Sequence, residues 1–289
     1  MIDLRSYKKE VEKIFEKNNI DREEVNMLFC EALNLSLSEL ILKKNITEKE
    51  QVEINRAIAK RLKGIPIQKI FKKAYFYGNT FFVNNNVLCP RPETELLVEE
   101  VLENIKFAKN NEKITKNKQK TSKKLKILDL CTGSGCIAIS IKKNSNEDIF
   151  ASDISKKALY VARKNAKNSD AKIRFLESDL FEKINQKFDI IVSNPPYIKS
   201  SDIQNLDTEV KNYDPILALD GGEDGLVFYK KIASQAKTYL NKNGTIILEV
   251  GYNQASDVKF LFEQNGFDCE IKKDYNNIER IVVCRLIKK

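Results

Sequence analysis

A polar turn directly after an apolar run carries the clearest chemical signal in the sequence. The run "FDIIVS", residues 188–193, is typical of a buried strand and is followed at once by Asn194, Pro195, Pro196 and Tyr197. An asparagine amide offers an acceptor and a donor, prolines fix the backbone, and tyrosine supplies a flat face. These residues are suited to hold a planar NH2 group, with its hydrogens on the Asn194 oxygen and the Pro195 carbonyl.

Such a site would turn an amide or aryl-amine nitrogen into a better nucleophile. The lone pair of that nitrogen is delocalised, and two acceptors that draw both hydrogens aside would direct it at an electrophile. With a positively charged sulfonium methyl donor, orientation and electrostatics can supply most of the rate. The chain contains no histidine, which excludes an imidazole base, a Ser-His-Asp relay and a histidine metal ligand.

Three further apolar runs each end in residues suited to bind a nucleoside. The first continues into "DLCTGSGCIA", residues 129–138, where glycines at a strand-to-helix turn let a ligand approach the backbone. The second ends at Asp153, whose carboxylate can accept hydrogen bonds from ribose hydroxyls, and the third ends at Asp179 and Leu180. Together they predict a nucleoside pocket. The glycine loop alone also satisfies the G-x-G-x-x-G/A dinucleotide pattern, which leaves an NAD site open.

Alternating strand-like and helix-like runs predict the scaffold that positions these residues. After residue 91, short apolar runs such as "LKILDL" and "GTIILEV" alternate with helical stretches, which indicates a mainly parallel sheet with helices on both faces. The last two runs, "FDCEIKK" and "ERIVVCRLI", are joined by a short turn and should pair antiparallel at the sheet edge. We therefore expect an α/β domain over residues 91–289.

The first ninety residues follow other patterns. Residues 1–73 have helical apolar spacing, with capping boxes expected at Asp21 and Thr47, each three residues before a glutamate. Residues 74–90 alternate aromatic side chains around Gly78-Asn79, which predicts a hairpin that turns at these two residues. We expect a small helical domain over residues 1–73 and a β-hairpin linker over residues 74–90.

Composition narrows the remaining functions. The net charge is +9, but residues 106–126 hold nine lysines against one glutamate, so the remainder is nearly neutral and this strip is typical of a solvated loop. No apolar run is long enough to span a bilayer and the start is charged, so we expect a cytoplasmic protein without a membrane partner. Six scattered cysteines without a CxxC pair indicate reduced thiols, with neither disulfides nor a metal site.

The motifs together resemble a known enzyme family. "NPPY" after a strand, downstream of "DLCTGSG", is similar to the amino-methyltransferase signature of S-adenosylmethionine enzymes with the class I fold. Five longer words resemble, in order and spacing, the peptide chain release factor glutamine methyltransferases over nearly the whole chain. They are "GIPIQKI", "FYGNTFFVNNNVLCPRPETELLVE", "YDPILALDGGEDGLVFYKKI", "LEVGYNQ" and "DYNNIERIVV". Two positions depart from the pattern: Cys131 replaces a usual glycine, and Leu180 a tryptophan of some relatives.

The resemblance implies a Rossmann-like, seven-stranded sheet with an antiparallel edge hairpin, and methyl transfer from S-adenosylmethionine. The acceptor would be the side-chain amide nitrogen, N5, of the glutamine in the Gly-Gly-Gln loop of bacterial class I release factors, gripped partly by the N-terminal domain. Asn194, Pro195, Pro196 and Tyr197 would receive this glutamine. We expect a monomer. The expected cofactor-binding residues are Asp129, Cys131, Thr132, Gly133, Ser134, Gly135, Asp153, Asp179, Leu180 and Asn194.

Three other functions share part of these motifs. A sister enzyme would methylate a glutamine of a ribosomal protein. An adenine-N6 DNA or RNA methyltransferase would need a target-recognition region and a broad basic face, which we do not find in the sequence, so we expect no direct nucleic-acid binding. A non-catalytic protein that only senses the nucleoside would have no use for Asn-Pro-Pro-Tyr.

Overall fold

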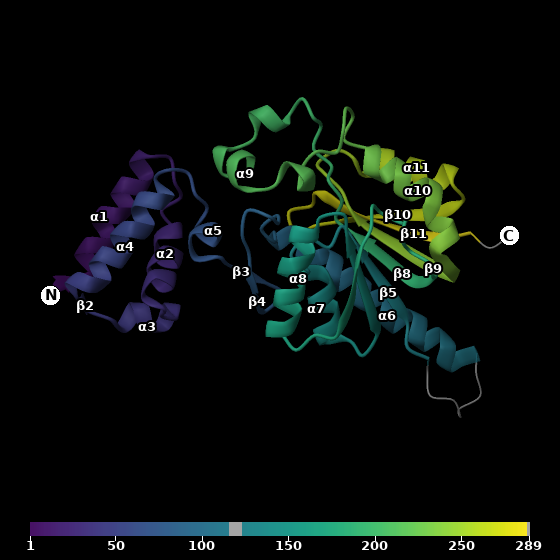
Figure 1. Cartoon of the computed structure of the whole chain (residues 1–289), viewed down its shortest axis with the longest axis horizontal. Coiled ribbons are helices and arrows are strands. Elements are labelled where there is room, and N and C mark those ends of the chain that lie inside the picture. Colours follow the sequence, from purple (N-terminus) through teal and green to yellow (C-terminus); the bar gives the residue numbers. More distant parts are fainter. Residues whose placement is uncertain (116–122, 288–289) are drawn as a thin grey trace. The chain divides into compact units, whose positions relative to one another are not determined.

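The computed structural model describes residues 1–115 and 123–287, with the backbone alone described for residues 111–115. The chain forms two compact units (Figure 1). The smaller unit consists of Met1–Lys73 and Asp207–Tyr213, and the larger of Ala74–Leu206 and Asp214–Lys289.

The smaller unit is helical because its apolar residues recur at helical spacing. Phe15, Val25, Leu28, Phe29 and Ile54 are fully buried and form the centre of its core. A two-stranded antiparallel pair joins the start of the chain to the segment before the fourth helix. The elements are β1 (Ile2–Asp3), α1 (Leu4–Lys17), α2 (Glu24–Leu33), α3 (Leu37–Leu42), β2 (Asn45–Ile46), α4 (Glu48–Arg61) and α5 (Ile67–Phe71).

The helix starts follow the sequence signals only in part. Thr47 and Glu50 form the expected capping box at the start of α4. Asp21 and Glu24 do not form a capping box at the start of α2. The Asp21 carboxylate accepts from the Glu23 backbone N–H, and the Glu24 carboxylate accepts from Arg61 instead. The Glu24 side chain thus serves tertiary structure, which a local capping rule does not consider.

A short helix from the far end of the sequence completes the smaller unit. Helix α9 (Thr208–Tyr213) packs here, and its Glu209 forms an ion pair with Arg61. The Arg61 side chain is only 3% exposed and also donates to both oxygens of Glu24, at 2.7 and 2.9 Å. A guanidinium matches carboxylates in this bidentate geometry. Arg61 therefore links α2, α4 and α9.

We predict that Arg61→Met lowers the free energy of unfolding by about 1–3 kcal/mol, since it leaves two carboxylates without their buried partner. The matched control is Arg56→Met, because Arg56 pairs with Glu53 on an exposed helix face. Exposed pairs contribute little, so the control should shift stability by less than about 0.5 kcal/mol. Urea denaturation of both variants measures the difference, and equal shifts would contradict the structural role given to Arg61.

The larger unit is built on a seven-stranded sheet in the order β10-β11-β9-β8-β5-β6-β7. All neighbouring strands are parallel except that β11 is antiparallel to both β9 and β10. The expected α/β class, with a mainly parallel sheet and an antiparallel edge pair, is confirmed. The strands are β5 (Lys126–Leu130), β6 (Asp148–Asp153), β7 (Ile173–Glu177), β8 (Phe188–Ser193), β9 (Leu240–Glu249), β10 (Phe267–Lys273) and β11 (Glu279–Leu286).

Helices cover both faces of this sheet (Figure 1). Consecutive strand residues point to opposite faces, so Ile246 and Leu248 pack on one core and Ile247 on the other. Helices α6 (Glu95–Thr115), α7 (Cys136–Asn144) and α8 (Lys156–Asn168) lie on the Ile247 face, and α10 (Val227–Tyr239) and α11 (Ala255–Gln264) on the other. Because the central strands are buried on both faces, their sequences are nearly continuous apolar runs.

Two boundaries differ from the sequence expectation. The hairpin of β3 (Lys73–Phe76) and β4 (Asn79–Phe82) turns at Tyr77-Gly78, one residue earlier than Gly78-Asn79, and both turn residues have positive φ. Helix α6 continues to Thr115, so the first half of the lysine-rich strip is helical and not a loop. Residues 116–122 of that strip lie outside the described residues.

Two of the six cysteines correct the expectation of free thiols. Cys269 and Cys284 lie directly opposite each other in the β10–β11 pair and form a disulfide. Cys30, Cys89, Cys131 and Cys136 are free, as expected. Sequence spacing could not reveal the pair, because it depends on the register of the edge hairpin.

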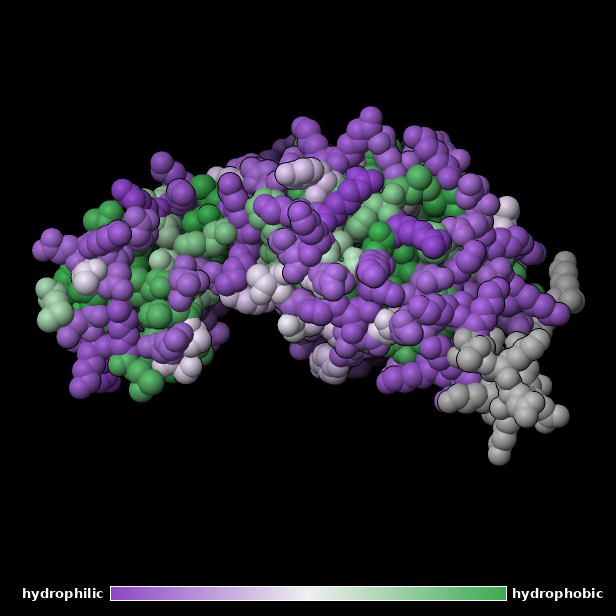
Figure 2. Space-filling model, turned by 60° about the horizontal axis from the view of Figure 1, so that its bottom comes forward, coloured by the Kyte–Doolittle hydropathy of each residue, from purple (hydrophilic) through white to green (hydrophobic). Residues whose placement is uncertain are grey.

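The face seen in Figure 2 is mainly hydrophilic, with small groups of apolar side chains between the hydrophilic ones. None of the helices in the described ranges is long and apolar enough to cross a membrane. Nor do the described residues contain a group of three or more His, Cys, Asp or Glu side chains that could hold a metal ion.

Candidate functional site

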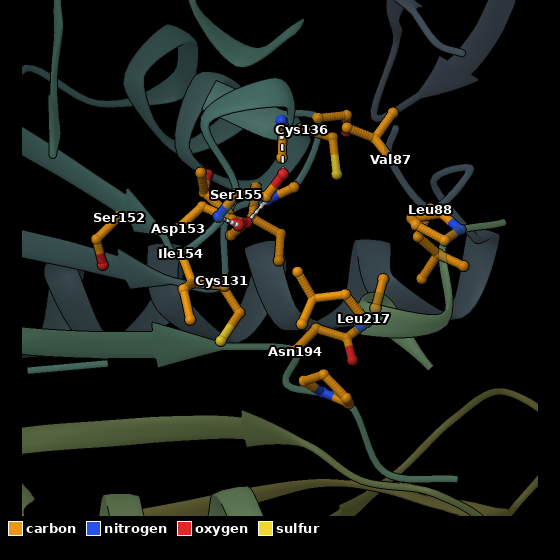
Figure 3. A pocket seen from close by; sticks show the side chains of 18 of the residues that line it. Val87, Leu88, Cys131, Cys136, Ser152, Asp153, Ile154, Ser155, Asn194 and Leu217 are labelled. Atoms are coloured by element: carbon orange, nitrogen blue, oxygen red, sulfur yellow. Dashed lines mark hydrogen bonds between the residues drawn. The ribbon is translucent and has the colours of Figure 1, made fainter. Parts of the chain in front are cut away.

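A cavity lies at the carboxyl edge of the sheet, inside the larger unit, where β5, β6, β7 and β8 end (Figure 3). In parallel sheets, strand ends and the loops after them form the usual ligand crevice. The predicted site residues that line this cavity are Cys131, Thr132, Gly133, Ser134, Asp153, Asp179, Leu180, Asn194 and Pro196. Asp129, Gly135, Pro195 and Tyr197 are not among its lining residues.

The loop after β5 turns sharply into α7. Thr132 donates its backbone N–H to the Ser152 carbonyl at 3.0 Å, and the Gly135 N–H donates to the Thr132 carbonyl at 2.8 Å. Gly133 has φ +53°, and a Cβ added there meets nothing within 4 Å, so a side chain would enter the space beside the loop. Gly135 has φ +81°, and its added Cβ would lie 3.1 Å from Ala162 Cβ. One glycine therefore leaves room for a ligand, and the other lets α8 pack closely.

Cys131, also in this loop, occupies the position where the family pattern has glycine. It has φ +59°, a left-handed conformation that favours glycine. Burial raises the pKa of its thiol above the ordinary range, with the Asp153 charge acting in the same direction. Burial likewise raises the pKa of Cys136 to about 12. Both cavity-lining thiols stay neutral and are unsuited to nucleophilic catalysis.

Asp129 lies beneath the loop and supports it from below. Its Oδ2 accepts from the Thr132 hydroxyl at 2.6 Å and from the Ala138 N–H at 3.2 Å, while its buried Oδ1 has no hydrogen-bond partner within the described structure. Burial raises the pKa of Asp129 to about 7, against the lowering effect of these two hydrogen bonds. Its carboxyl group therefore holds the shape of the loop.

Asp153 presents a carboxylate at the end of β6. Its Oδ2 accepts from the Gly133 N–H at 2.9 Å and its Oδ1 from the Ser155 N–H at 2.8 Å, bonds drawn in Figure 3. A carboxylate oxygen accepts more than one hydrogen bond, so both oxygens keep capacity for a ligand. Burial raises the pKa of Asp153, and the two backbone hydrogen bonds lower it.

The next strand end forms another wall. After β7, Asp179 is half-buried and Leu180 is buried with φ +43°, a turn that places both at the cavity. The Ser178 hydroxyl donates to the Leu180 carbonyl at 2.9 Å and supports this turn. Leu180 thus offers an apolar surface beside the polar one of Asp179.

The Asn-Pro-Pro-Tyr loop after β8 is held from several sides. Asn194 lines the cavity and donates from Nδ2 to the Thr94 hydroxyl at 3.3 Å. At the other end, the Gln254 amide donates to the Tyr197 carbonyl at 3.0 Å and accepts from the Gly251 N–H at 3.0 Å. Burial raises the pKa of Tyr197 to about 12, so its ring stays neutral. This part of the "LEVGYNQ" word is therefore a brace for the loop.

A neighbouring segment pairs with the chain just beyond Tyr197. The Ile198 N–H donates to the Leu219 carbonyl at 3.0 Å, and the Gly221 N–H donates to the Ile198 carbonyl at 2.7 Å. A Cβ added at Gly221 would lie 2.7 Å from Tyr197 Cα. Gly221 and Gly225 of "LDGGEDG" are thus needed because the backbone of Tyr197 lies close to both.

Several residues that line the cavity do not follow a strand and were not predicted from the sequence. They come from the segment before η1 (Pro92–Thr94), from η3 (Ile216–Ala218) and from α10, and Figure 3 shows Val87, Leu88 and Leu217 across the cavity from Ile154. Asp214 anchors the first segment by accepting from the Cys89 N–H at 3.4 Å and pairing with Arg91 at 3.1 Å. The only sequence signal was their place inside the long words "NNNVLCPRPET" and "YDPILALDGG".

The lack of histidine gives the pH dependence of stability a simple cause. Asp129 and Glu249 are fully buried, and burial raises each pKa to about 7. Between the ordinary pKa of 3.8 for Asp129 or 4.5 for Glu249 and the raised pKa of about 7, each group is ionised in the unfolded chain but protonated in the folded one. The free energy of unfolding therefore falls as pH rises towards 7.

We predict that the free energy of unfolding falls between pH 5 and 8, by on the order of 2 kcal/mol for each group. Urea denaturation at each pH measures it. Asp129→Asn should flatten the slope, and a stability that rises across this interval would contradict the assignment.

The sheet order, the glycine loop, the acidic strand end and the Asn-Pro-Pro-Tyr turn define an S-adenosylmethionine-dependent methyltransferase. Two family profiles match: "Methyltransferase small domain" over residues 112–211 and "PrmC N-terminal domain" over residues 8–71. A release factor glutamine methyltransferase from Thermodesulfovibrio yellowstonii is 40% identical over 283 residues, 96% of this chain and 97% of that one. The chain therefore belongs to the release factor glutamine methyltransferase family.

Two further relatives carry the same name. The protein from Clostridium acetobutylicum is 42% identical over 230 residues, 77% of this chain and 76% of that one. The protein from Agrobacterium fabrum is 36% identical over 268 residues, 91% and 89% of the respective chains. The resemblance described from the motifs is thus confirmed over both the helical and the α/β parts.

Proposed function

We propose that this chain transfers a methyl group from S-adenosylmethionine to the side-chain amide nitrogen of the glutamine in the Gly-Gly-Gln loop of bacterial class I release factors, and so supports translation termination. The names of its relatives support the substrate. The observation that carries the chemistry is the Asn194 amide, which lies in the wall of the cavity and is fixed by a hydrogen bond to Thr94.

The cavity fits S-adenosylmethionine by its own features. Gly133 leaves open space beside the loop for the amino-acid tail, and Asp153 keeps acceptor capacity for the ribose hydroxyls. Leu180 and Ile154 offer apolar contact for the base, with Asp179 as a polar neighbour. When bound, the cofactor supplies an electrophilic methyl group that already carries the positive charge of its sulfonium.

The Asn-Pro-Pro-Tyr loop would orient the substrate. The Asn194 oxygen and the Pro195 carbonyl accept the two hydrogens of the substrate NH2 group, and the Tyr197 ring stacks on the amide plane. Because its backbone is held by Gln254 and the Gly221 segment, the loop is already shaped for this task. The excess proton on the methylated nitrogen is acidic and leaves to water, so no histidine is needed.

The helical unit would recognise the release factor away from the reacting glutamine. Its core is complete without the cavity residues, and its surface carries exposed apolar side chains such as Leu37, Ile41 and Leu42. We place the reaction in the cytoplasm, where release factors act, and expect the chain to work as a monomer.

The test is transfer of labelled methyl from S-adenosylmethionine to three substrates side by side. They are a bacterial class I release factor, the same factor with its loop glutamine changed to alanine, and double-stranded DNA. Label in the intact factor alone supports the proposal. Label in DNA, or equal label in both factors, would overturn it.

A further inference from the structure

A buried carboxyl group, that of Glu249, lies next to Asn194 and is not among the residues that line the cavity. Strands β8 and β9 pair in parallel with Ser193 opposite Leu248, so Asn194, the first residue after β8, lies beside Glu249, the last residue of β9. Glu249 is 4% exposed, and its Oε2 has no hydrogen-bond partner within the described structure. It does not line the cavity, so it cannot take a proton from a substrate there. A buried carboxyl at this position needs an explanation.

The surroundings of Glu249 are polar and come from three elements. Burial raises the pKa of Glu249 to about 7, while hydrogen bonding from Thr94 and Asn194 and the charge of Arg280 lower it, and Glu93 raises it. The Glu249 backbone carbonyl accepts from the Tyr229 hydroxyl at 2.8 Å, which holds the residue in place. The Asn194 Nδ2 atom lies 3.3 Å from the Thr94 hydroxyl oxygen.

These groups impose a direction on the Asn194 amide. An ionised carboxylate only accepts hydrogen bonds, so an ionised Glu249 favours a Thr94 hydroxyl that donates towards it and offers its lone pairs to Asn194. Asn194 must then present its NH2 group to Glu249 and to Thr94, which also lines the cavity, so the Asn194 oxygen is the atom left to accept from a substrate. The proposed reaction needs an acceptor, not a donor, at the cavity. A reversed amide would aim N–H groups at the N–H groups of the substrate.

We propose that Glu249 is a positioning residue, which acts with Thr94 to fix the Asn194 amide with its oxygen towards the cavity. This inference rests on the proposed function, because only an NH2-bearing substrate makes the direction of the amide matter. Glu249 is the glutamate of "LEVGYNQ", and this role is separate from the bracing of the loop by Gln254.

The direction also depends on the ionisation of Glu249. A protonated Glu249 can donate, and it then tolerates either orientation of the Thr94 hydroxyl and of the Asn194 amide. Activity should therefore fall as pH drops through about 7. Arg280, Glu93 and Tyr197 face the same region, so their charges set the exact midpoint.

The test compares Glu249→Gln with wild type, using the release factor as substrate. Glutamine has the same shape but can donate, so we expect kcat to fall about tenfold, the loss of one oriented hydrogen bond. The dissociation constant for S-adenosylmethionine and the melting temperature at pH 8 should not worsen. The acid limb of the pH–rate profile should disappear in this variant.

Two variants of Thr94 test the same role without removing the carboxyl group of Glu249. Thr94→Val removes the hydroxyl and should lower kcat about as much as Glu249→Gln. Thr94→Ser keeps the hydroxyl and should retain at least half of wild-type kcat. This pair decides the question if Glu249→Gln fails to fold.

The outcomes separate the inference from the proposed function. A wild-type chain that does not methylate the release factor would overturn the function itself. An active wild type with unchanged kcat in Glu249→Gln and Thr94→Val would overturn the positioning role alone. A loss of kcat that follows the unfolded fraction, with an intact acid limb, would show a merely structural role and would also overturn it.

Discussion

Asn194→Ala is expected to lower kcat for methyl transfer about 10²- to 10³-fold, the usual effect of removing one pre-oriented polar group from a reacting centre. The side chain lines the cavity, and its Nδ2 donates to Thr94, so its Oδ1 is the atom that would accept from the substrate amide. Its loss would leave one hydrogen of the substrate amide without a partner and the nitrogen lone pair delocalised. The effect should therefore be on turnover.

The binding of S-adenosylmethionine to Asn194→Ala should stay within about threefold of wild type, because most cofactor contacts come from other strand ends. Isothermal titration calorimetry measures it beside the kinetics. Asn168→Ala, an exposed residue at the end of α8, is the control and should behave as wild type. Full activity of Asn194→Ala would contradict the assignment of the loop, whereas loss of cofactor binding alone would assign Asn194 to the other half of the site.

Gly221→Ala is expected to cost both stability and activity. Its added Cβ would lie 2.7 Å from Tyr197 Cα and 2.8 Å from Tyr197 C, and both are backbone atoms that cannot rotate away. The Tyr197 loop or the Gly221 segment must shift, at a cost of about 1–3 kcal/mol of unfolding free energy. A shift of the loop also moves the substrate acceptors, so kcat should fall by about 10²-fold.

The control for this prediction is Gly266→Ala. Gly266 has φ +85°, but the nearest atom to its added Cβ is the flexible Lys237 Nζ at 3.8 Å. This variant should lose about 1 kcal/mol through backbone conformation and keep its kcat. Denaturation and steady-state kinetics on both variants separate the effects. Equal losses of kcat would mean that Gly221 acts only through global stability.

Most of the α/β fold could be predicted because its strands are buried on both faces. Runs such as "FDIIVS" and "KILDL" are mostly apolar, which indicates buried strands. The helices between successive strands then require parallel crossover connections. Strand ends then converge on one edge as a consequence of topology. This is why Cys131, Asp153, Leu180 and Asn194, far apart in sequence, line one cavity.

Features that depend on register or on long-range partners could not be predicted. The Cys269–Cys284 bond depends on how one edge strand aligns with the next. The placement of α9 in the helical unit rests on the ion pair between Glu209 and Arg61, which are distant in sequence. Glu249 belongs to the "LEVGYNQ" motif, but its position beside Asn194 depends on the pairing of β8 with β9 and could not be predicted.

We propose that this chain methylates the side-chain amide of one glutamine. The most direct measurement is tandem mass spectrometry of a release factor incubated with the enzyme and S-adenosylmethionine. We expect a mass increase of one methylene group on the glutamine of the Gly-Gly-Gln loop, present with the wild type and nearly absent with Asn194→Ala. An unmodified loop glutamine, or a methyl group on any other residue, would contradict it.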